Sequence, residues 1–219
     1  IIMNHSLINI QSVVKNSFDI VIPNSILKKY HDEILKTNMY KLNITTLVQE
    51  ILNLYKPNED TYIVDYSNNC FYSIMCAKQK FNVIYNNSLQ KYNKFIELSK
   101  IINRVEFINI NSKFKINNYI KTKFVPLLIL TNPKYITNSK RPLNSYKIHN
   151  IIIIRDDDNS NDIKEYKVLL EKNYIFYKID VLLTKINKLH EFLKEDKYSS
   201  IIAVAPNSKY SNIETIYFD

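Results

Sequence analysis

The sequence predicts an α/β domain built on a doubly wound, mostly parallel seven-stranded sheet. From residue 61 onward, short apolar runs alternate with longer segments whose apolar residues recur every three or four positions. Hydrophobic residues make up 46% of the 219 residues, which is enough to bury a continuous core. Apolar strands that alternate with amphipathic helices are typical of a parallel sheet that is covered on both faces.

Seven runs rich in Ile, Val, Leu, Tyr and Phe predict the strands of this sheet. In chain order they are Tyr62–Asp65, Phe81–Tyr85, Arg104–Ile110, Val125–Leu130, Asn150–Arg155, Tyr174–Val181 and Ser200–Ala205. A further run, Ile213–Phe218, predicts an additional edge strand. The helices predicted between the strands are Phe71–Lys80, Leu89–Ile102, Asp162–Lys172 and Leu183–Lys194. Ligands of doubly wound sheets bind at the carboxyl ends of the strands, so we expect the functional site there.

A mainly helical extension, residues 1–56, is predicted to precede the core of residues 57–219. Its expected elements are a short edge strand at Phe18–Pro23, a helix capped by Asn24 or Ser25, and a helix that begins at Thr45 or Thr46. The Pro57–Asp60 segment ends the second helix and marks the start of the core.

The chain contains no glycine. Glycine is the usual residue where the backbone needs a positive φ angle or must approach a ligand closely. Asparagine tolerates positive φ better than other side chains, so we expect Asn at such turns. Glycine-rich phosphate loops are excluded, and any site that depends on bare backbone must be missing or rebuilt.

Lys and Arg outnumber Asp and Glu, 30 against 21, which gives a formal net charge of +9. A basic balance favours phosphate-rich partners, and RNA is therefore predicted as a partner. Lysine-rich codon usage in an AT-rich genome would give the same composition, so this alternative stays open.

The two cysteines, Cys70 and Cys76, are predicted to be buried free thiols. Their spacing fits neither a metal site nor a disulfide framework, and it indicates a reducing, intracellular compartment. The four histidines are scattered, so no metal is predicted. No stretch reaches 18 apolar residues, so no membrane span is predicted. The opening residues lack the pattern of a secretory signal.

The first predicted strand ends in Ile63-Val64-Asp65, a helix follows, and the next strand begins at Phe81. This order and spacing, which continues to about Arg155, resembles the class I S-adenosylmethionine-dependent methyltransferases. That family usually follows its first strand with Asp-x-Gly-x-Gly-x-Gly, which lays bare backbone against the methionine part of the cofactor. Here the run reads Asp65-Tyr66-Ser67-Asn68-Asn69-Cys70-Phe71, so the acid is kept and every glycine position carries a side chain.

The resemblance also places amides where the family has acids. The family's second strand ends with an acid that bonds the ribose hydroxyls, and the region here reads Tyr85-Asn86-Asn87. Asn111 stands where the family has an acid that reads the adenine amino group. An amide still accepts a hydrogen bond, with roughly half the strength of a charged acceptor. Asp65, Asn87 and Asn111 are therefore interpreted as a vestigial cofactor site, with S-adenosylmethionine bound only if the site is functional.

The fourth predicted strand leads into Thr131-Asn132-Pro133-Lys134-Tyr135. This segment resembles the Asn-Pro-Pro-Tyr motif of amino-group methyltransferases and the Ser-Pro-Pro-Trp version of trimethylguanosine synthases. In those enzymes the Asn or Ser accepts a hydrogen bond from the target amine, and the aromatic residue stacks on the base. The resemblance gives such catalytic roles to Asn132, Pro133 and Tyr135 if the protein is active, although Lys134 replaces the second proline.

Basic residues gather between the fourth and fifth predicted strands. They are Lys134, Lys140, Arg141 and Lys147. Tyr135 and Tyr146 lie among them in the sequence, and cations beside aromatic rings are a usual way to hold unpaired bases. These four residues are predicted to bind RNA, and a solvated loop in a lysine-rich protein is the alternative.

Together these patterns favour a methyltransferase-fold protein with an eroded cofactor site. It would act as an RNA-binding, regulatory or structural subunit of an RNA-processing or ribonucleoprotein assembly, beside a protein partner. The alternative is an active RNA methyltransferase that modifies an exocyclic amine, of a cap guanine or another base. A third hypothesis is a purely structural subunit with little RNA affinity of its own.

Overall fold

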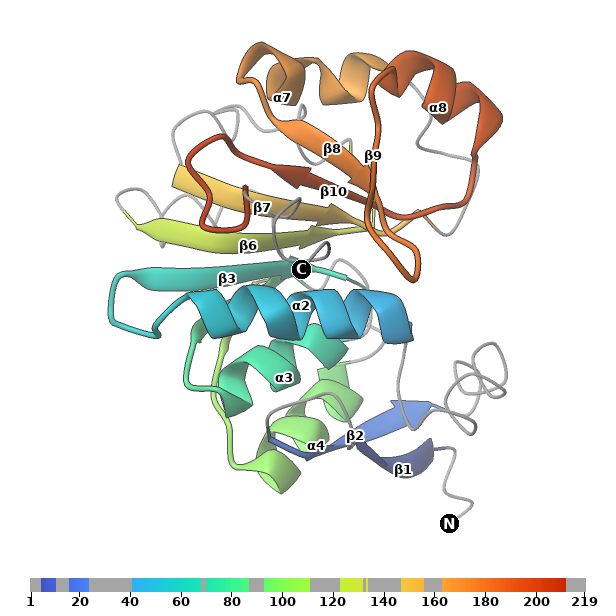
Figure 1. The fold of residues 1–219 in the computed structure, drawn as a ribbon. Coiled ribbons are helices and arrows are strands. Elements are labelled where there is room, and N and C mark those ends of the chain that lie inside the picture. The colour runs from blue at the N-terminus through green and yellow to red at the C-terminus, as the bar shows by residue number, and fades with distance from the viewer. Residues whose placement is uncertain are drawn as a thin grey trace.

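An extended β-sheet forms the centre of the molecule, and helices pack on both of its faces (Figure 1). The computed structural model describes residues 5–10, 16–23, 41–67, 70–86, 93–110, 123–131, 133, 147–155 and 163–211. The predicted strand Ile213–Phe218 and the predicted helix that begins at Asn24 or Ser25 lie outside these residues.

The central sheet has eight strands in the described part of the chain. They are β3 (Thr61–Tyr66), β4 (Asn82–Asn86), β5 (Ile108–Ile110), β6 (Phe124–Leu130), β7 (Lys147–Ile153), β8 (Ile175–Lys178), β9 (Thr184–Lys185) and β10 (Ile201–Val204). Their order across the sheet is β5-β4-β3-β6-β7-β10-β8-β9. Strands β3 to β7 are parallel, whereas β10 lies between β7 and β8 and is antiparallel to both. The prediction of a doubly wound, mostly parallel sheet is confirmed, and each predicted core strand has its counterpart.

The helices divide between the two faces of the sheet. One face is covered by α2 (Leu42–Leu54), α3 (Phe71–Lys78) and α4 (Asn93–Asn103), which contribute Val48, Ile74 and Ile96 to its hydrophobic core. The other face is covered by the 3₁₀ turn η4 (Ile163–Tyr166), α7 (Lys167–Glu171) and α8 (Leu189–Glu195). Side chains of both layers are buried against strands that are themselves apolar on both sides, as a parallel sheet requires.

The predicted helix Leu183–Lys194 is wrong in its first half. Thr184 and Lys185 form β9, which pairs with the edge of β8, and α8 begins only at Leu189. The chain turns after β8 because the Asp180 carboxylate accepts a hydrogen bond from the N–H of Val181 at 2.9 Å. Val181 is 83% exposed at this turn. Its apolar side chain therefore fitted the periodicity of a buried helical face, although the structure does not bury it.

The N-terminal segment begins with an antiparallel strand pair, β1 (His5–Ile10) and β2 (Phe18–Pro23), so the predicted strand at Phe18–Pro23 is confirmed. Strand β2 packs on α4, where the N–H of Val21 donates to Ser99 Oγ at 2.9 Å. Phe18 and Ile20 belong to the same hydrophobic cluster as α2 and α3. The division of the chain at residue 57 stays a prediction, since the described parts on both sides share this cluster.

Several turns hold non-glycine residues at positive φ. Within the described residues they are Lys41, Cys70, Lys80, Arg104 and Asn173, so the expectation that Asn takes such turns is wrong for four of these five. Three of them follow helices whose last carbonyls are bonded by the N–H groups of Phe81, Val105 and Tyr174, each reaching back five residues. This pattern is the Schellman motif, in which the backbone hydrogen bonds set the conformation whatever the side chain.

We expect Lys80→Gly to stabilise the fold. A left-handed conformation costs a non-glycine residue about 1–2 kcal/mol, and glycine avoids this cost but loses more chain entropy on folding. The free energy of unfolding in urea should therefore rise by about 0.5–1 kcal/mol. Ala77→Gly, inside α3, is the matched control and should lower it by a similar amount. A loss of stability in Lys80→Gly would contradict the strain at this position.

Candidate functional site

The ends of β3 and β6 lie side by side at the carboxyl edge of the sheet. Tyr66 pairs with Leu130, and Thr131 Oγ1 donates a hydrogen bond to the carbonyl oxygen of Tyr66 at 3.3 Å. Pro133 is buried. The fold therefore brings the start of the predicted Asn-Pro segment to the strand end that carries Asp65.

Asp65 is fully buried at the end of β3 and has both carboxylate oxygens engaged. Oδ1 accepts from the N–H of Ser67 at 2.7 Å, and Oδ2 accepts from the hydroxyl of Ser73 at 2.7 Å. Burial raises the pKa of the carboxyl group from 3.8 to about 6, against the opposing effect of these hydrogen bonds. The carboxylate thus fastens the loop after β3 to the first turn of α3.

The turn into α3 keeps a positive φ without glycine. Cys70 has φ 50° and ψ 5°, and its carbonyl accepts the N–H of Ile74 at 3.0 Å, which starts the helix. Burial, and next the nearby Asp65 charge, raise the pKa of the Cys70 thiol well above its ordinary value. Cys70 and Cys76 are both buried and free, as predicted. Cys70 is therefore an inert packing residue that has taken a glycine-like turn.

The two bulky rings of the glycine-free run are buried in the core. Phe71 is 1% exposed and packs edge-on against Phe18 of β2, with ring centroids 5.2 Å apart. Tyr66 belongs to the hydrophobic cluster on the opposite face of the sheet. The two rings therefore anchor the loop to the hydrophobic clusters on the two faces of the sheet. The sequence did not predict this arrangement.

Two asparagines at the same edge, to which the sequence analysis assigned no role, have buried amide oxygens. Asn86 at the end of β4 is 4% exposed, and neither its Oδ1 nor that of Asn109 in β5 has a hydrogen-bond partner within the described residues. Tyr85, which precedes Asn86, is fully buried, and its ring lies edge-on to the ring of Phe107. Buried amide oxygens are usually paired, so they mark the ends of β4 and β5 as polar sites. The alternation of side chains along a strand could have indicated this, because it places Asn109 on the same face of the sheet as the apolar residue Phe107.

Most of the predicted site residues cannot be placed. Asn87, Asn111, Asn132, Lys134, Tyr135, Lys140 and Arg141 lie outside the described residues. Lys147 begins β7, where it pairs with Phe124. The described part of the chain contains no group of three potential metal ligands, and none of its helices has the length and hydrophobicity to cross a membrane.

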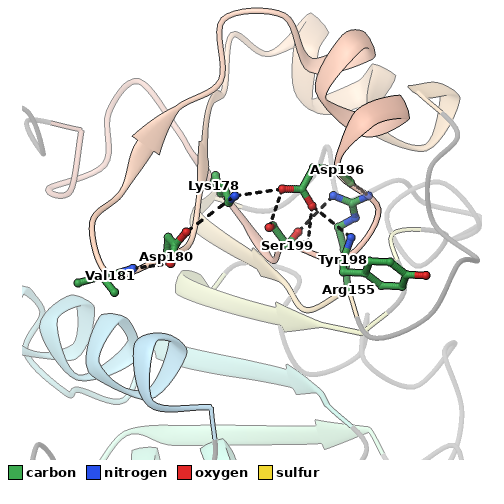
Figure 2. Close-up of polar contacts among 7 residues, drawn as sticks. All are labelled: Arg155, Lys178, Asp180, Val181, Asp196, Tyr198 and Ser199. Carbon is green, nitrogen blue, oxygen red and sulfur yellow. Dashed lines mark hydrogen bonds and ion pairs between the residues drawn. The ribbon is translucent and has the colours of Figure 1, made fainter.

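A buried arginine follows β7 at this edge (Figure 2). Arg155 is 2% exposed and donates to the carbonyl oxygens of Asp196 at 2.7 Å and Ser199 at 3.2 Å. Burial alone would raise the pKa of the Asp196 carboxyl group, but hydrogen bonds from Ser199 and Lys178 outweigh it and lower the pKa to about 2. The guanidinium holds backbone carbonyls beyond α8, so it is a structural anchor of the sheet.

No protein-family model and no curated protein matches the sequence. Solved structures match it instead, and we compared three. A T. thermophilus 16S rRNA methyltransferase, solved with S-adenosylmethionine and guanosine, matches with a TM-score of 0.54 at 9% identity over 92% of this chain and 50% of its own. A Pyrococcus abyssi tRNA (uracil-54, C5)-methyltransferase matches with a TM-score of 0.50 at 15% identity over 91% and 44%.

A putative methyltransferase of Streptococcus mutans matches with a TM-score of 0.50 at 13% identity over 92% of this chain and 56% of its own. The chain spans about half the length of these three proteins. At such identities the likeness concerns architecture alone. The chain thus has an α/β architecture with a mixed, mostly parallel central sheet, the Rossmann-like methyltransferase fold.

Proposed function

We propose that this methyltransferase-fold protein has lost efficient use of S-adenosylmethionine and acts as an RNA-binding or regulatory subunit of an RNA-processing or ribonucleoprotein assembly. The observation that carries the proposal is the state of Asp65. It is the one carboxylate among the residues that the family resemblance assigns to the cofactor, and both of its oxygens accept hydrogen bonds from the protein.

S-adenosylmethionine presents an ammonium group and two ribose hydroxyls that need acceptors. Asp65 is fully buried, and Ser67 and Ser73 already take one acceptor position on each of its oxygens. A ligand group would have to displace the loop after β3 to reach the remaining positions. Asn87 and Asn111, the other assigned positions, supply amides without charge. These residues fit the cofactor poorly.

RNA as the partner is supported by charge and by the comparisons. The chain carries a net charge of +9, and the predicted RNA-binding residues Lys134, Lys140, Arg141 and Lys147 lie in the sequence between the end of β6 and the start of β7. Two of the three similar structures are RNA methyltransferases by name. A protein with this fold and a poor cofactor site can still position RNA or a catalytic partner.

Isothermal titration with S-adenosylmethionine tests the proposal. We expect a Kd weaker than about 1 mM, which corresponds to roughly −4 kcal/mol. Asp65→Asn should leave the titration unchanged, because the carboxylate is committed to the loop. Micromolar binding by the wild type would contradict the proposal, and a loss of that binding in Asp65→Asn would assign it to the Asp65 site.

The alternative is an active RNA N-methyltransferase, and the contact between Thr131 and Tyr66 favours it, since this contact brings the Asn-Pro segment to the cofactor edge. A methyl-transfer assay of the same protein with RNA and S-adenosylmethionine distinguishes the two functions. Methyl transfer that is lost in Asn132→Ala would establish the alternative, with Asn132, Pro133 and Tyr135 at the target amine. Absence of transfer by a folded, RNA-binding protein supports the proposal.

A further inference from the structure

A basic groove runs along the amino edge of the sheet, opposite to the carboxyl edge that carries Asp65. Two adjoining cavities of about 480 and 570 Å³ share Asn16, Lys78 and Lys80 as lining residues. Lys56 lines the first cavity and Arg104 lines the second. These cations follow or end the helices α2, α3 and α4, so three helix ends converge on the groove.

Every ionisable side chain with a formal charge in the lining is a cation. The lining of both cavities contains Lys56, Lys78, Lys80 and Arg104 and no Asp or Glu. Two acids that are near in sequence are paired elsewhere, Asp60 with Lys123 and Glu106 with Lys100. Within the residues that the structure describes, none of the four cations has a carboxylate partner. The groove therefore concentrates positive charge that no carboxylate of the described residues neutralises.

Two of these cations occupy positions that suit other residues. Lys80 and Arg104 have φ angles of 69° and 53°, at helix ends where glycine or asparagine is favoured. Asparagine is abundant in this chain and is used at the equivalent position 173. A cation at a helix C-terminus also interacts favourably with the helix dipole, so the experiment must separate stability from binding.

We propose that the basic groove binds the phosphate backbone of RNA, as a second contact surface on the edge opposite to the one that carries Asp65. The inference rests on the proposed RNA-binding function and extends it. Lysine, arginine and amide side chains are common ligands of phosphate oxygens, and the groove supplies all three. A protein partner fits less well, because protein interfaces use exposed apolar anchors, and none of the large exposed apolar residues of the described chain lines the groove.

The test compares two triple variants in binding to a fluorescent single-stranded RNA, by anisotropy at several salt concentrations. The groove variant combines Lys56→Gln, Lys80→Asn and Arg104→Asn, and the asparagines suit positive φ, so folding should be kept. We expect a Kd at least about tenfold weaker, and a salt dependence less steep by about 2 in log–log slope, from three lost phosphate contacts. The control combines Lys167→Gln, Lys194→Gln and Lys197→Gln, which removes the same charge from exposed positions on the α7–α8 side.

Each result decides the inference. Weakening confined to the groove variant, with urea stability kept, supports it. Equal weakening by both variants assigns the effect to net charge and overturns it. If the wild type binds RNA and only Lys140→Gln with Arg141→Gln weakens binding, the inference fails while the proposed function stands. A wild type without RNA affinity at low salt removes both. Displacement of the RNA by polyglutamate at equal charge would assign the groove to an acidic protein instead.

Discussion

Replacing Asp65 by asparagine is expected to raise the free energy of unfolding by about 2–3 kcal/mol at pH 7.5. Burial raises the pKa of this carboxyl group from 3.8 to about 6, so the folded state holds the charged form at a cost. An amide has nearly the same shape. Its oxygen can accept from the N–H of Ser67, and its NH₂ can donate to Ser73 Oγ, so both contacts are kept, although the Ser73 hydroxyl must turn to another acceptor.

The effect should depend on pH in a defined direction. Between about pH 4 and 6 the carboxyl group ionises in the unfolded chain but keeps its proton in the folded one. The folded state then binds more protons, so this group lowers stability as pH rises through that range. The gain in Asp65→Asn should be small at pH 4 and complete above pH 7.

Urea unfolding of wild type and variant at pH 4, 5.5 and 7.5 measures this dependence. Asp180→Asn removes an exposed carboxylate and serves as the control, with an expected change within about 0.5 kcal/mol. A variant that is less stable than wild type at all three pH values would show that the charge itself holds the loop.

Tyr55→Phe is expected to lower the free energy of unfolding by about 3 kcal/mol. The Tyr55 hydroxyl lies between α2 and the sheet, where it contacts His149 Nδ1 at 3.0 Å, Ser208 Oγ at 3.2 Å and the N–H of Lys209 at 3.2 Å. Ser208 keeps a bond to Asn150 at 2.8 Å when the hydroxyl is removed. His149 and the N–H of Lys209 lose a partner in a part-buried place, at about 1–2 kcal/mol each.

Thermal and urea unfolding of Tyr55→Phe measure the loss, and Tyr198→Phe is the matched control. Tyr198 is 65% exposed, so loss of its hydroxyl should change the free energy of unfolding by less than about 0.5 kcal/mol. A change below about 1 kcal/mol in Tyr55→Phe would mean that water replaces the hydroxyl. The hydroxyl would then not be the contact that ties α2 to β7 and to the turn after β10.

The sheet was predictable because its strands are apolar on both faces. Val125 to Leu130 leaves no side chain for solvent, and only a covered parallel strand or a buried helix suits such a run. The β8–β9 turn was not predictable in the same way. Periodicity continues through Val181 and Leu182, whereas the chain reverses because of one side-chain contact at Asp180 and an open sheet edge.

A site residue could be predicted only where its position followed from the end of a predicted strand. Asp65 was placed by its position after an apolar run, but its engagement with Ser73 depends on how α3 returns to β3. Asn86 and Asn109 were overlooked because asparagine usually marks turns. The cations of the basic groove lie up to 48 positions apart in sequence, between Lys56 and Arg104, and only the packing of three helices brings them together.

The insertion of β10 between β7 and β8 has a consequence for synthesis of the chain. Residues 201–204 leave the ribosome after every other described strand, yet they pair with both neighbours. Until then β7 and β8 each present an open edge to the cell, and open edges recruit foreign strands. The sheet can therefore be completed only after residues 201–204 are synthesised, and before that point its open edges are most exposed to aggregation.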